Sequence, residues 1–380
     1  MKKILRIVLL VFAVLLTAYF TWSFLGRSVP PVNVQLYLDS TFVLNVDSGK
    51  GNVIGINPYM ETTDYASKEH FQKKIEGYLI AAKEKGWLNE KSVIVFPEYI
   101  GAWLVLEGEK NSVYEAETST GALTTYVASN FFSFLKHYFI APDSAEDIQK
   151  HAAFAMKGAQ MAKTYQEVFE TLAKNYKVTI IAGSILLPNP VVKKGKIKIQ
   201  KGSLYNVTAI FNPDGSIQPQ LVKKVYPTAD ELPFITKCPP SEIPVFDLPI
   251  GRSAVLICAD SWYPDCYDVL KDKNPRFIAV PSYTSKDGSM KTAWKGYSCF
   301  EAPAYVDKND MGKITLGEAW MKYTLPARIK TTGAPYGITV SLRGKLWDLG
   351  ADGEIIAVNR SSVFTPSYMN GASMVCMWVE

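Results

Sequence analysis

Three short motifs in the sequence each contain one side chain suited to acyl-transfer chemistry. Glu98 lies in FPEYIG, Lys224 in VKKVYPTADE and Cys258 in LICADSWYP. We expect each of them where a buried strand runs into a turn. A cysteine attacks as its thiolate, a carboxylate can take and return the thiol proton, and a lysine can stabilise an oxyanion. Together they supply what cleavage of an amide requires.

Each of these residues, taken alone, has an ordinary structural explanation. A cysteine in an apolar strand usually packs, a lysine is usually solvated, and an acidic residue after proline is common. The functional hypothesis therefore depends on the three motifs occurring together.

In this order, the motifs resemble those of the nitrilase superfamily of carbon-nitrogen hydrolases. FPE followed by Gly101 matches the glutamate motif of that family. Cys258 lies in a match to its I-C-x-D-x-x-x-P pattern, with Asp260 and Pro264 in place. The lysine motif has the form K-x-x-P-T-x-x-E, which selects Lys224 and places its glutamate at position 231.

The resemblance implies a role for each site residue. Glu98 would act as the general base and acid, Cys258 would carry a thioester, and Lys224 would face the oxyanion. The backbone N–H of Ala259 would be a second oxyanion donor. Glu231 would orient Lys224 or the substrate nitrogen, although a capping or surface acid is an alternative interpretation of it.

The resemblance covers about residues 52–358 and implies a four-layer αββα sandwich, paired into a homodimer or larger homo-oligomer. No cofactor or metal is implied. Ala259 and Asp260 stand where true nitrile hydrolysers carry Trp-Glu, and Arg328 alone keeps the late-helix pattern of many members. We therefore expect a small-molecule amide or acyl substrate and not a nitrile.

Three other functions compete with hydrolysis. Apolipoprotein N-acyltransferases are relatives with a similar cysteine motif, and they pass the acyl group to an amine. A papain-like enzyme would need His137 or His151 beside the cysteine. A binding module without activity is the third alternative, against which the presence of all three reactive side chains argues.

Short β-branched, nearly continuous apolar runs separate the motifs. Strands of this kind are buried on both faces, so other layers must cover the sheet. They alternate with helical patterns at 67–85, 145–175, 263–271 and 317–330, which predicts an α/β layered sandwich. The expected strands are residues 52–57, 92–96, 178–187, 207–211, 253–259, 276–282 and 336–342.

Two long stretches, 101–150 and 283–316, interrupt this alternation and are candidate lids. The first contains FFSFLKHYF, for which an ordinary core helix is the favoured interpretation.

The N-terminus carries an uncharged apolar run over residues 7–25. As a helix it would measure about 28 Å, close to the thickness of the hydrocarbon core. We expect a retained single-pass anchor in the cell membrane, with a cleaved signal peptide as the alternative. Lys2, Lys3 and Arg6 predict a cytoplasmic N-terminus and an extracytoplasmic catalytic domain, and Tyr19 and Trp22 fit an interfacial aromatic belt.

These features divide the chain into an anchor (1–28), a linker that leads into the domain (29–50) and a carbon-nitrogen hydrolase domain (51–380). Of 380 residues, 48% are hydrophobic and 20% are charged, which is typical of a globular protein. The net charge of +5 falls to about +2 without the N-terminal cluster, which argues against nucleic-acid binding. The five cysteines form no CxxC pair, so no structural zinc is expected.

Overall fold

The computed structural model describes residues 2–30, 32–297, 299–367 and 370–380. In this part of the chain, a seven-stranded sheet has the order β1-β17-β2-β4-β5-β8-β9. Its strands are β1 (Leu38–Leu44), β17 (Ala372–Trp378), β2 (Asn52–Asn57), β4 (Ser92–Val95), β5 (Thr179–Pro188), β8 (Leu204–Phe211) and β9 (Val222–Lys223).

A six-stranded sheet has the order β10-β11-β12-β13-β15-β16 within the same described residues. Its strands are β10 (Val245–Leu248), β11 (Gly251–Val255), β12 (Phe277–Ser282), β13 (Tyr336–Ser341), β15 (Ile356–Asn359) and β16 (Ser362–Phe364). The two sheets pack face to face. A Cβ placed on Gly55 of β2 would lie 2.4 Å from Ile338 and 2.9 Å from Val340 of β13, so the absence of a side chain lets the sheets approach.

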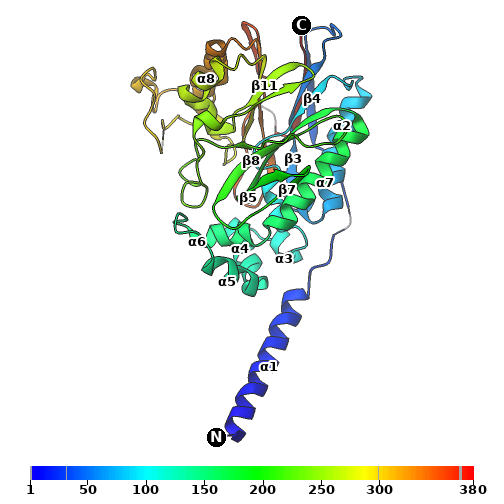
Figure 1. The fold of residues 1–380 in the computed structure, drawn as a ribbon, viewed down its shortest axis with the longest axis vertical. Coiled ribbons are helices and arrows are strands. Elements are labelled where there is room, and N and C mark those ends of the chain that lie inside the picture. The colour runs from blue at the N-terminus through cyan, green and yellow to red at the C-terminus, as the bar shows by residue number, and fades with distance from the viewer. Residues whose placement is uncertain (1, 31, 298, 368–369) are drawn as a thin grey trace.

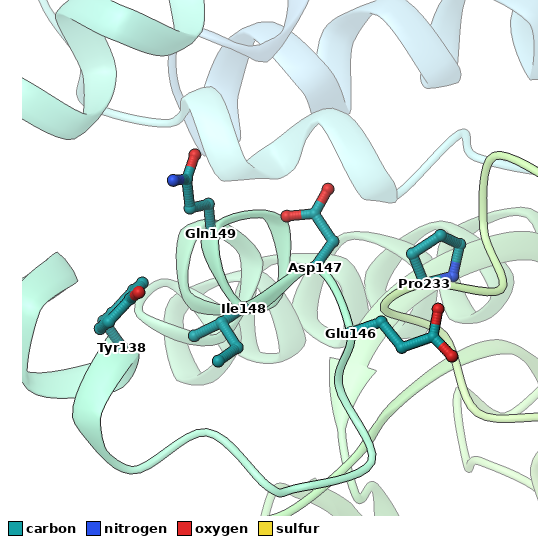
Figure 2. Close-up of a pocket in the computed structure, with 6 residues that line it drawn as sticks. All are labelled: Tyr138, Glu146, Asp147, Ile148, Gln149 and Pro233. Atoms are coloured by element: carbon teal, nitrogen blue, oxygen red, sulfur yellow. The ribbon is translucent and has the colours of Figure 1, made fainter.

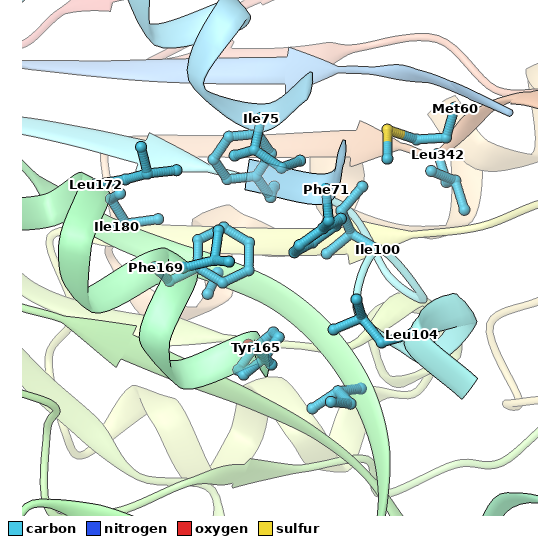
Figure 3. Close-up of a cluster of buried hydrophobic side chains, with 14 of the residues drawn as sticks. Met60, Phe71, Ile75, Ile100, Leu104, Tyr165, Phe169, Leu172, Ile180 and Leu342 are labelled. Atoms are coloured by element: carbon cyan, nitrogen blue, oxygen red, sulfur yellow. The ribbon is translucent and has the colours of Figure 1, made fainter. Parts of the chain in front are cut away.

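Helices cover the outer face of each sheet, which gives the αββα sandwich that was predicted. Helices α2 (Lys68–Glu84) and α7 (Gly158–Tyr176) cover the seven-stranded sheet, as Figure 1 shows. Phe71 and Ile75 of α2 meet Phe169 and Leu172 of α7 in the core drawn in Figure 3. Helices α8 (Pro264–Lys271), α9 (Leu316–Tyr323) and α10 (Leu325–Arg328) pack on the other sheet.

The apolar runs of the sequence are continuous because alternate residues enter different cores. Val93 and Val95 of β4 lie in the core between the sheets. Ile94, between them, lies in the core beneath α2 and α7. Successive side chains of a strand point to opposite faces, so a strand covered on both faces needs an apolar residue at every position.

Most expected elements are present, with four differences. The helix expected at 317–330 is divided into α9, α10 and a 3₁₀ helix (Ile329–Thr332). The strand expected at 253–259 ends at Val255, and Cys258 lies in the 3₁₀ helix that follows it. The helix expected at 145–175 is divided into α6 (Ile148–Ala155) and α7. The region predicted as linker, 29–50, contains β1, which pairs in parallel with β17 at the edge of the sheet.

Residues 101–150 form mostly helices, namely α3 (Asn111–Tyr114), α4 (Ser119–Ser129), α5 (Phe131–Phe139) and α6. FFSFLKHYF is helix α5, but the interpretation as a core helix is wrong, because none of its residues is buried. Helix α5 lies at the surface beside α1, and its contacts with α1 are described below.

Helix α1 (Lys2–Phe24) projects away from the layered part of the molecule (Figure 1). Among the described residues, it is the helix long and apolar enough to cross a membrane. Length and composition alone do not separate an anchor from a signal sequence.

Candidate active site

The three predicted residues each follow the end of a strand, and the strands come from both sheets. Glu98 is three residues beyond β4, and Lys224 directly follows β9. Cys258 begins the 3₁₀ helix η4 (Cys258–Trp262), which follows β11 of the facing sheet. The sandwich therefore brings the three motifs together from three distant parts of the chain.

The lysine lies between two carboxylates. Lys224 Nζ is 2.7 Å from Glu98 Oε1 and 2.5 Å from Glu231 Oε2. The thiol of Cys258 lies close enough to Glu98 for the carboxylate to raise the pKa of the thiol. All four side chains are buried. The structure thus places a thiol, an ammonium and two carboxylates in one cluster that is buried from solvent.

Asn206 and Tyr99 complete this cluster, and the sequence reasoning missed both. Asn206 Nδ2 donates to Glu98 Oε1 and to Glu231 Oε1, each at 2.9 Å. Tyr99 donates its hydroxyl proton to Glu231 Oε1 at 2.5 Å. These donors hold two like-charged groups in fixed orientations. An amide side chain within the otherwise mostly apolar run of β8 was the signal that the sequence offered for Asn206.

The turn that carries Cys258 is tied to the turn that carries Lys224. Asp260 accepts hydrogen bonds from the backbone N–H groups of Val225 (2.9 Å), Tyr226 (2.8 Å) and Ile257 (3.0 Å). Asp260 therefore positions the turn that carries Cys258 against the turn that carries Lys224, which accounts for the aspartate in the cysteine motif.

The backbone at the site is strained. Cys258 has φ 49° and Tyr99, next to Glu98, has φ 63°, both in the left-handed region that residues with a Cβ rarely adopt. Such conformations persist where the surrounding structure determines them, and they cluster at functional sites. From this turn, Cys258 donates its thiol proton to the carbonyl oxygen of Tyr283 at 3.6 Å.

Ala259 is the second residue of η4. Amides at the start of a helix have no acceptor within the helix. The N–H of Ala259 directly follows Cys258 in the chain. It is therefore a donor of the kind that the predicted oxyanion contact needs.

Burial and neighbouring charges set the protonation of the cluster. Burial raises the pKa of Glu98, Lys224 opposes the rise, and Glu231 adds to it. Burial works against the charge on Lys224, but Glu231 and Glu98 outweigh it and raise the pKa of the lysine well above its ordinary value. Burial works against the charge on Glu231, but Lys224 lowers its pKa. Burial and Glu98 raise the pKa of Cys258. At rest, the thiol keeps its proton beside a carboxylate that can take it.

A bulge in β5 fixes the position of the glutamate turn. Ser184 donates its backbone N–H to Pro97 O at 3.1 Å, and its Oγ accepts from the N–H of Tyr99 at 2.9 Å. Gly183, in the same bulge, has φ 66°, and a Cβ there would lie 2.1 Å from Pro97 O. Only glycine therefore lets β5 approach the residue before Glu98.

We expect Gly183→Ala to lower the free energy of unfolding by on the order of 2–4 kcal/mol, because it adds this clash to left-handed strain. Turnover should fall too, since the clash displaces Glu98. Gly195→Ala is the matched control, with φ 70° and no atom within 4 Å of the added Cβ. It should cost only about 1 kcal/mol. Equal losses in urea denaturation of the two variants would contradict this account of the bulge.

The histidines required by a papain-like mechanism lie elsewhere. His151 Nε2 contacts Gly202 O at 3.1 Å, and His137 Nδ1 contacts Ser133 O at 2.8 Å. Both contacts lie within or beside the α5 and α6 region. The cysteine's polar neighbours are instead Glu98 and Tyr283.

A separate hollow of about 330 Å³ lies between Pro233 and the segment that runs from α5 to the start of α6 (Figure 2). The N–H of Asp147, at the start of α6, donates to the carbonyl oxygen of Pro233 at 2.7 Å. The helical region 131–155 thus lies directly beside the segment that carries Glu231. The lining consists of Tyr138, Glu146, Asp147, Ile148, Gln149 and Pro233.

Comparisons with known proteins identify the family of the chain. The family model for carbon-nitrogen hydrolases matches residues 53–298. The chain is 24% identical over 186 residues to the probable hydrolase YhcX of Bacillus subtilis (strain 168), a match that covers 47% of this chain and 34% of that protein. The chain thus spans about a third of the length of this curated relative.

Solved structures of an amidase from Nesterenkonia sp. share the fold. The complex of a mutant of the AN1 amidase with acrylamide is 13% identical, with a TM-score of 0.50, covering 87% of this chain and 92% of that chain. A mutant complex with butyramide is 12% identical, with a TM-score of 0.50, covering 86% and 90%.

Proposed function

Because this chain belongs to the carbon-nitrogen hydrolase family, we propose that it hydrolyses the C–N bond of a small, non-peptide amide through a thioester on Cys258. The observation that carries the proposal is the buried contact set in which Lys224 bridges Glu98 and Glu231 beside the thiol. In the proposed roles, Cys258 is the nucleophile, Glu98 the general base and acid, and Lys224 the oxyanion partner.

The first half of the reaction forms the thioester. Sγ of Cys258 attacks the amide carbon while Glu98 takes the thiol proton. The carbonyl oxygen becomes an oxyanion, stabilised by Lys224 and the N–H of Ala259. Glu98 then gives its proton to the nitrogen, the C–N bond breaks, and ammonia or an amine leaves.

The second half regenerates the thiol. Water attacks the thioester carbon and gives a proton to Glu98. The same oxyanion partners stabilise the second tetrahedral intermediate. The C–S bond then breaks, the sulfur takes the proton back from Glu98, and a carboxylic acid leaves. Glu231 and Asn206 touch only other protein groups in this scheme and hold Lys224 and Glu98 in place.

Ammonia release from a panel of short amides in ¹⁸O-labelled water tests the proposal. Hydrolysis predicts one equivalent of acid per ammonia, with one labelled oxygen in the acid. Turnover only when a primary amine is added, with an N-substituted amide as product, would instead support the acyltransferase alternative, because both reactions share the thioester and differ in the acceptor.

The pH dependence follows from the charges around Glu98. Since Glu98 must be ionised to accept the thiol proton, its raised pKa should place the acidic limb of kcat/KM above the ordinary carboxyl range. Glu231→Gln removes a charge that raises the pKa of Glu98 and of Lys224. The acidic limb, which Glu98 sets, and the alkaline limb, which loss of the Lys224 proton sets, should therefore both move to lower pH in this variant.

The matched control for this profile is Asp230→Asn, which removes an exposed acid from the adjacent position. Its profile should stay at the parental position. An acidic limb that stays in place in Glu231→Gln, or moves to higher pH, would contradict the assignment of that limb to Glu98.

We place this activity outside the cell membrane, with 1–28 as a retained single-pass anchor, 29–50 as the connection and 51–380 as the catalytic domain. Support comes from the basic cluster before α1 and from the length of the apolar run. The homodimer or larger homo-oligomer that the family resemblance implies stays a prediction.

A further inference from the structure

Helix α5 exposes large apolar side chains at the surface of the molecule. Phe131, Phe132 and Phe139 are 44%, 47% and 76% exposed, and Ile140, which follows the helix, is 43% exposed. A run of exposed aromatic side chains on one short helix marks an interaction surface. Lys136 adds a positive charge in its last turn.

This surface adjoins α1. Figure 1 shows α5 at the end of the molecule from which α1 projects. The ring of Phe132 lies 5.3 Å from that of Tyr19 and 5.6 Å from that of Phe20. The backbone N–H of Phe131 donates to the Tyr19 hydroxyl at 3.0 Å, and that hydroxyl donates to Ala128 O at 3.2 Å.

Hydrogen bonds fix the last turn of α1 against the catalytic part. Ser23 is buried there and donates its hydroxyl to Ser129 O at 2.6 Å. Lys110 donates to Trp22 O at 2.5 Å and lies 4.7 Å from the centre of its ring. These contacts hold the direction of α1 relative to α5.

An ion-pair network reinforces this joint. Arg27 NH1 lies 3.1 Å from Glu109 Oε2, and Lys157 Nζ lies 2.7 Å from Glu109 Oε1. Arg27 NH1 also donates to Gly108 O at 2.8 Å. Glu109 is buried. Its carboxylate therefore links Arg27, which follows α1, to Lys157, which directly precedes α7.

The level of α5 in a bilayer follows from this joint. Tyr19 lies six residues before the end of the apolar run at Leu25, which is about 9 Å along a helix. Phe132 contacts Tyr19, so it must lie at a similar depth, near the boundary between headgroups and acyl chains. Interfacial helices bury their apolar face about 5–10 Å into that boundary.

We propose that α5 is an interfacial helix whose exposed phenylalanines insert into the same leaflet that the end of α1 crosses. The occupant is phospholipid, because the surface is continuous with a membrane-spanning helix and Lys136 complements anionic headgroups. With α1 and α5 both engaged, the catalytic part is held in one orientation against the membrane. The inference rests on the proposed anchoring by α1.

The test uses the full chain in vesicles of phosphatidylcholine and phosphatidylglycerol, with a nitrobenzoxadiazole fluorophore on a single introduced cysteine. The variants are Phe139→Cys on α5, Lys193→Cys at the exposed end of β6 (Val191–Lys193), and Leu15→Cys in the middle of α1. The parent chain, treated in the same way, sets the background from partly exposed Cys299.

We expect Phe139→Cys to show blue-shifted emission and several-fold stronger quenching by lipids with a nitroxide near the head of the acyl chain than Lys193→Cys. Leu15→Cys should be quenched best by a deeper nitroxide. Fluorophore emission in Phe139→Cys that matches emission in water, together with lipid quenching in Leu15→Cys, would overturn the inference and leave the anchor intact. A blue shift in Phe139→Cys without lipid quenching would show that protein, such as a second copy of the chain, covers α5 in place of lipid, and would also overturn the inference. An unquenched Leu15→Cys would overturn the anchor itself.

Discussion

Replacing Cys258 with alanine is expected to abolish both amide turnover and covalent labelling by thiol-directed amide analogues, while Cys266→Ala leaves both intact. Removal of the nucleophile of a concerted catalytic set costs on the order of 10⁴-fold or more in kcat. Cys258 lies beside Glu98, which can take its proton. Burial raises the pKa of both thiols, so their positions make the difference: Cys266 lies on α8, outside the cluster of Glu98, Lys224 and Glu231.

Peptide mass spectrometry after labelling identifies the modified cysteine, and thermal unfolding of both variants controls for folding. Cys266→Ala is the matched control because it removes a buried thiol only eight positions along the chain. Equal labelling of the two variants would remove Cys258 from its proposed role.

The second large effect is expected for Lys224→Met. This substitution leaves Glu98 and Glu231 buried without the cation between them, and breaking a buried ion pair from one side costs about 3–5 kcal/mol. Turnover should fall below detection, since the oxyanion loses its charged partner.

The destabilisation should depend on pH in a defined direction. Lys224 lowers the pKa of both carboxyls, so both pKa values rise when it is removed. A carboxyl whose pKa is raised in the folded state stabilises the fold at low pH and loses that contribution as pH rises through the raised value. The deficit of Lys224→Met relative to the parent should therefore be greatest near neutral pH and shrink on acidification.

Lys223→Met is the control for this substitution. Lys223 is partly buried, and its ammonium lies 4.5 Å from the centre of the Tyr205 ring, an interaction worth about 0.5–1 kcal/mol. Urea denaturation in detergent should show a small loss, and activity should be retained. A similar loss in both lysine variants would refute the selection of Lys224 by the motif.

The sequence predicted the layered core well because burial on both faces leaves a local signature. Strands such as β4 and β5 are buried at every position and consist mostly of apolar residues, so each was recognisable alone. Strand β17 was not recognised. Its sequence, ASMVCMW, has little β-branched character, and it is a strand because β1 and β2, more than 300 residues earlier, pair with both of its edges.

The site was predictable to the extent that its residues lie in motifs. Glu98, Lys224, Glu231 and Cys258 were found from their flanking residues. Asn206 was not, because its importance depends on a position between two carboxylates that come from other segments. Similarly, FFSFLKHYF has the composition of a core helix, and its place at the surface beside α1 depends on contacts with residues more than 100 positions earlier.

Trapping the acyl-enzyme tests the central claim most directly. The full chain is mixed with an amide that it turns over, quenched in acid during the steady state, digested and mapped by mass spectrometry. The account predicts an acyl group, with loss of the amine, on the peptide that carries Cys258, and its disappearance after a chase without substrate. Turnover with no acyl adduct on that peptide, or with a chase-sensitive adduct on another cysteine such as Cys299, would contradict it.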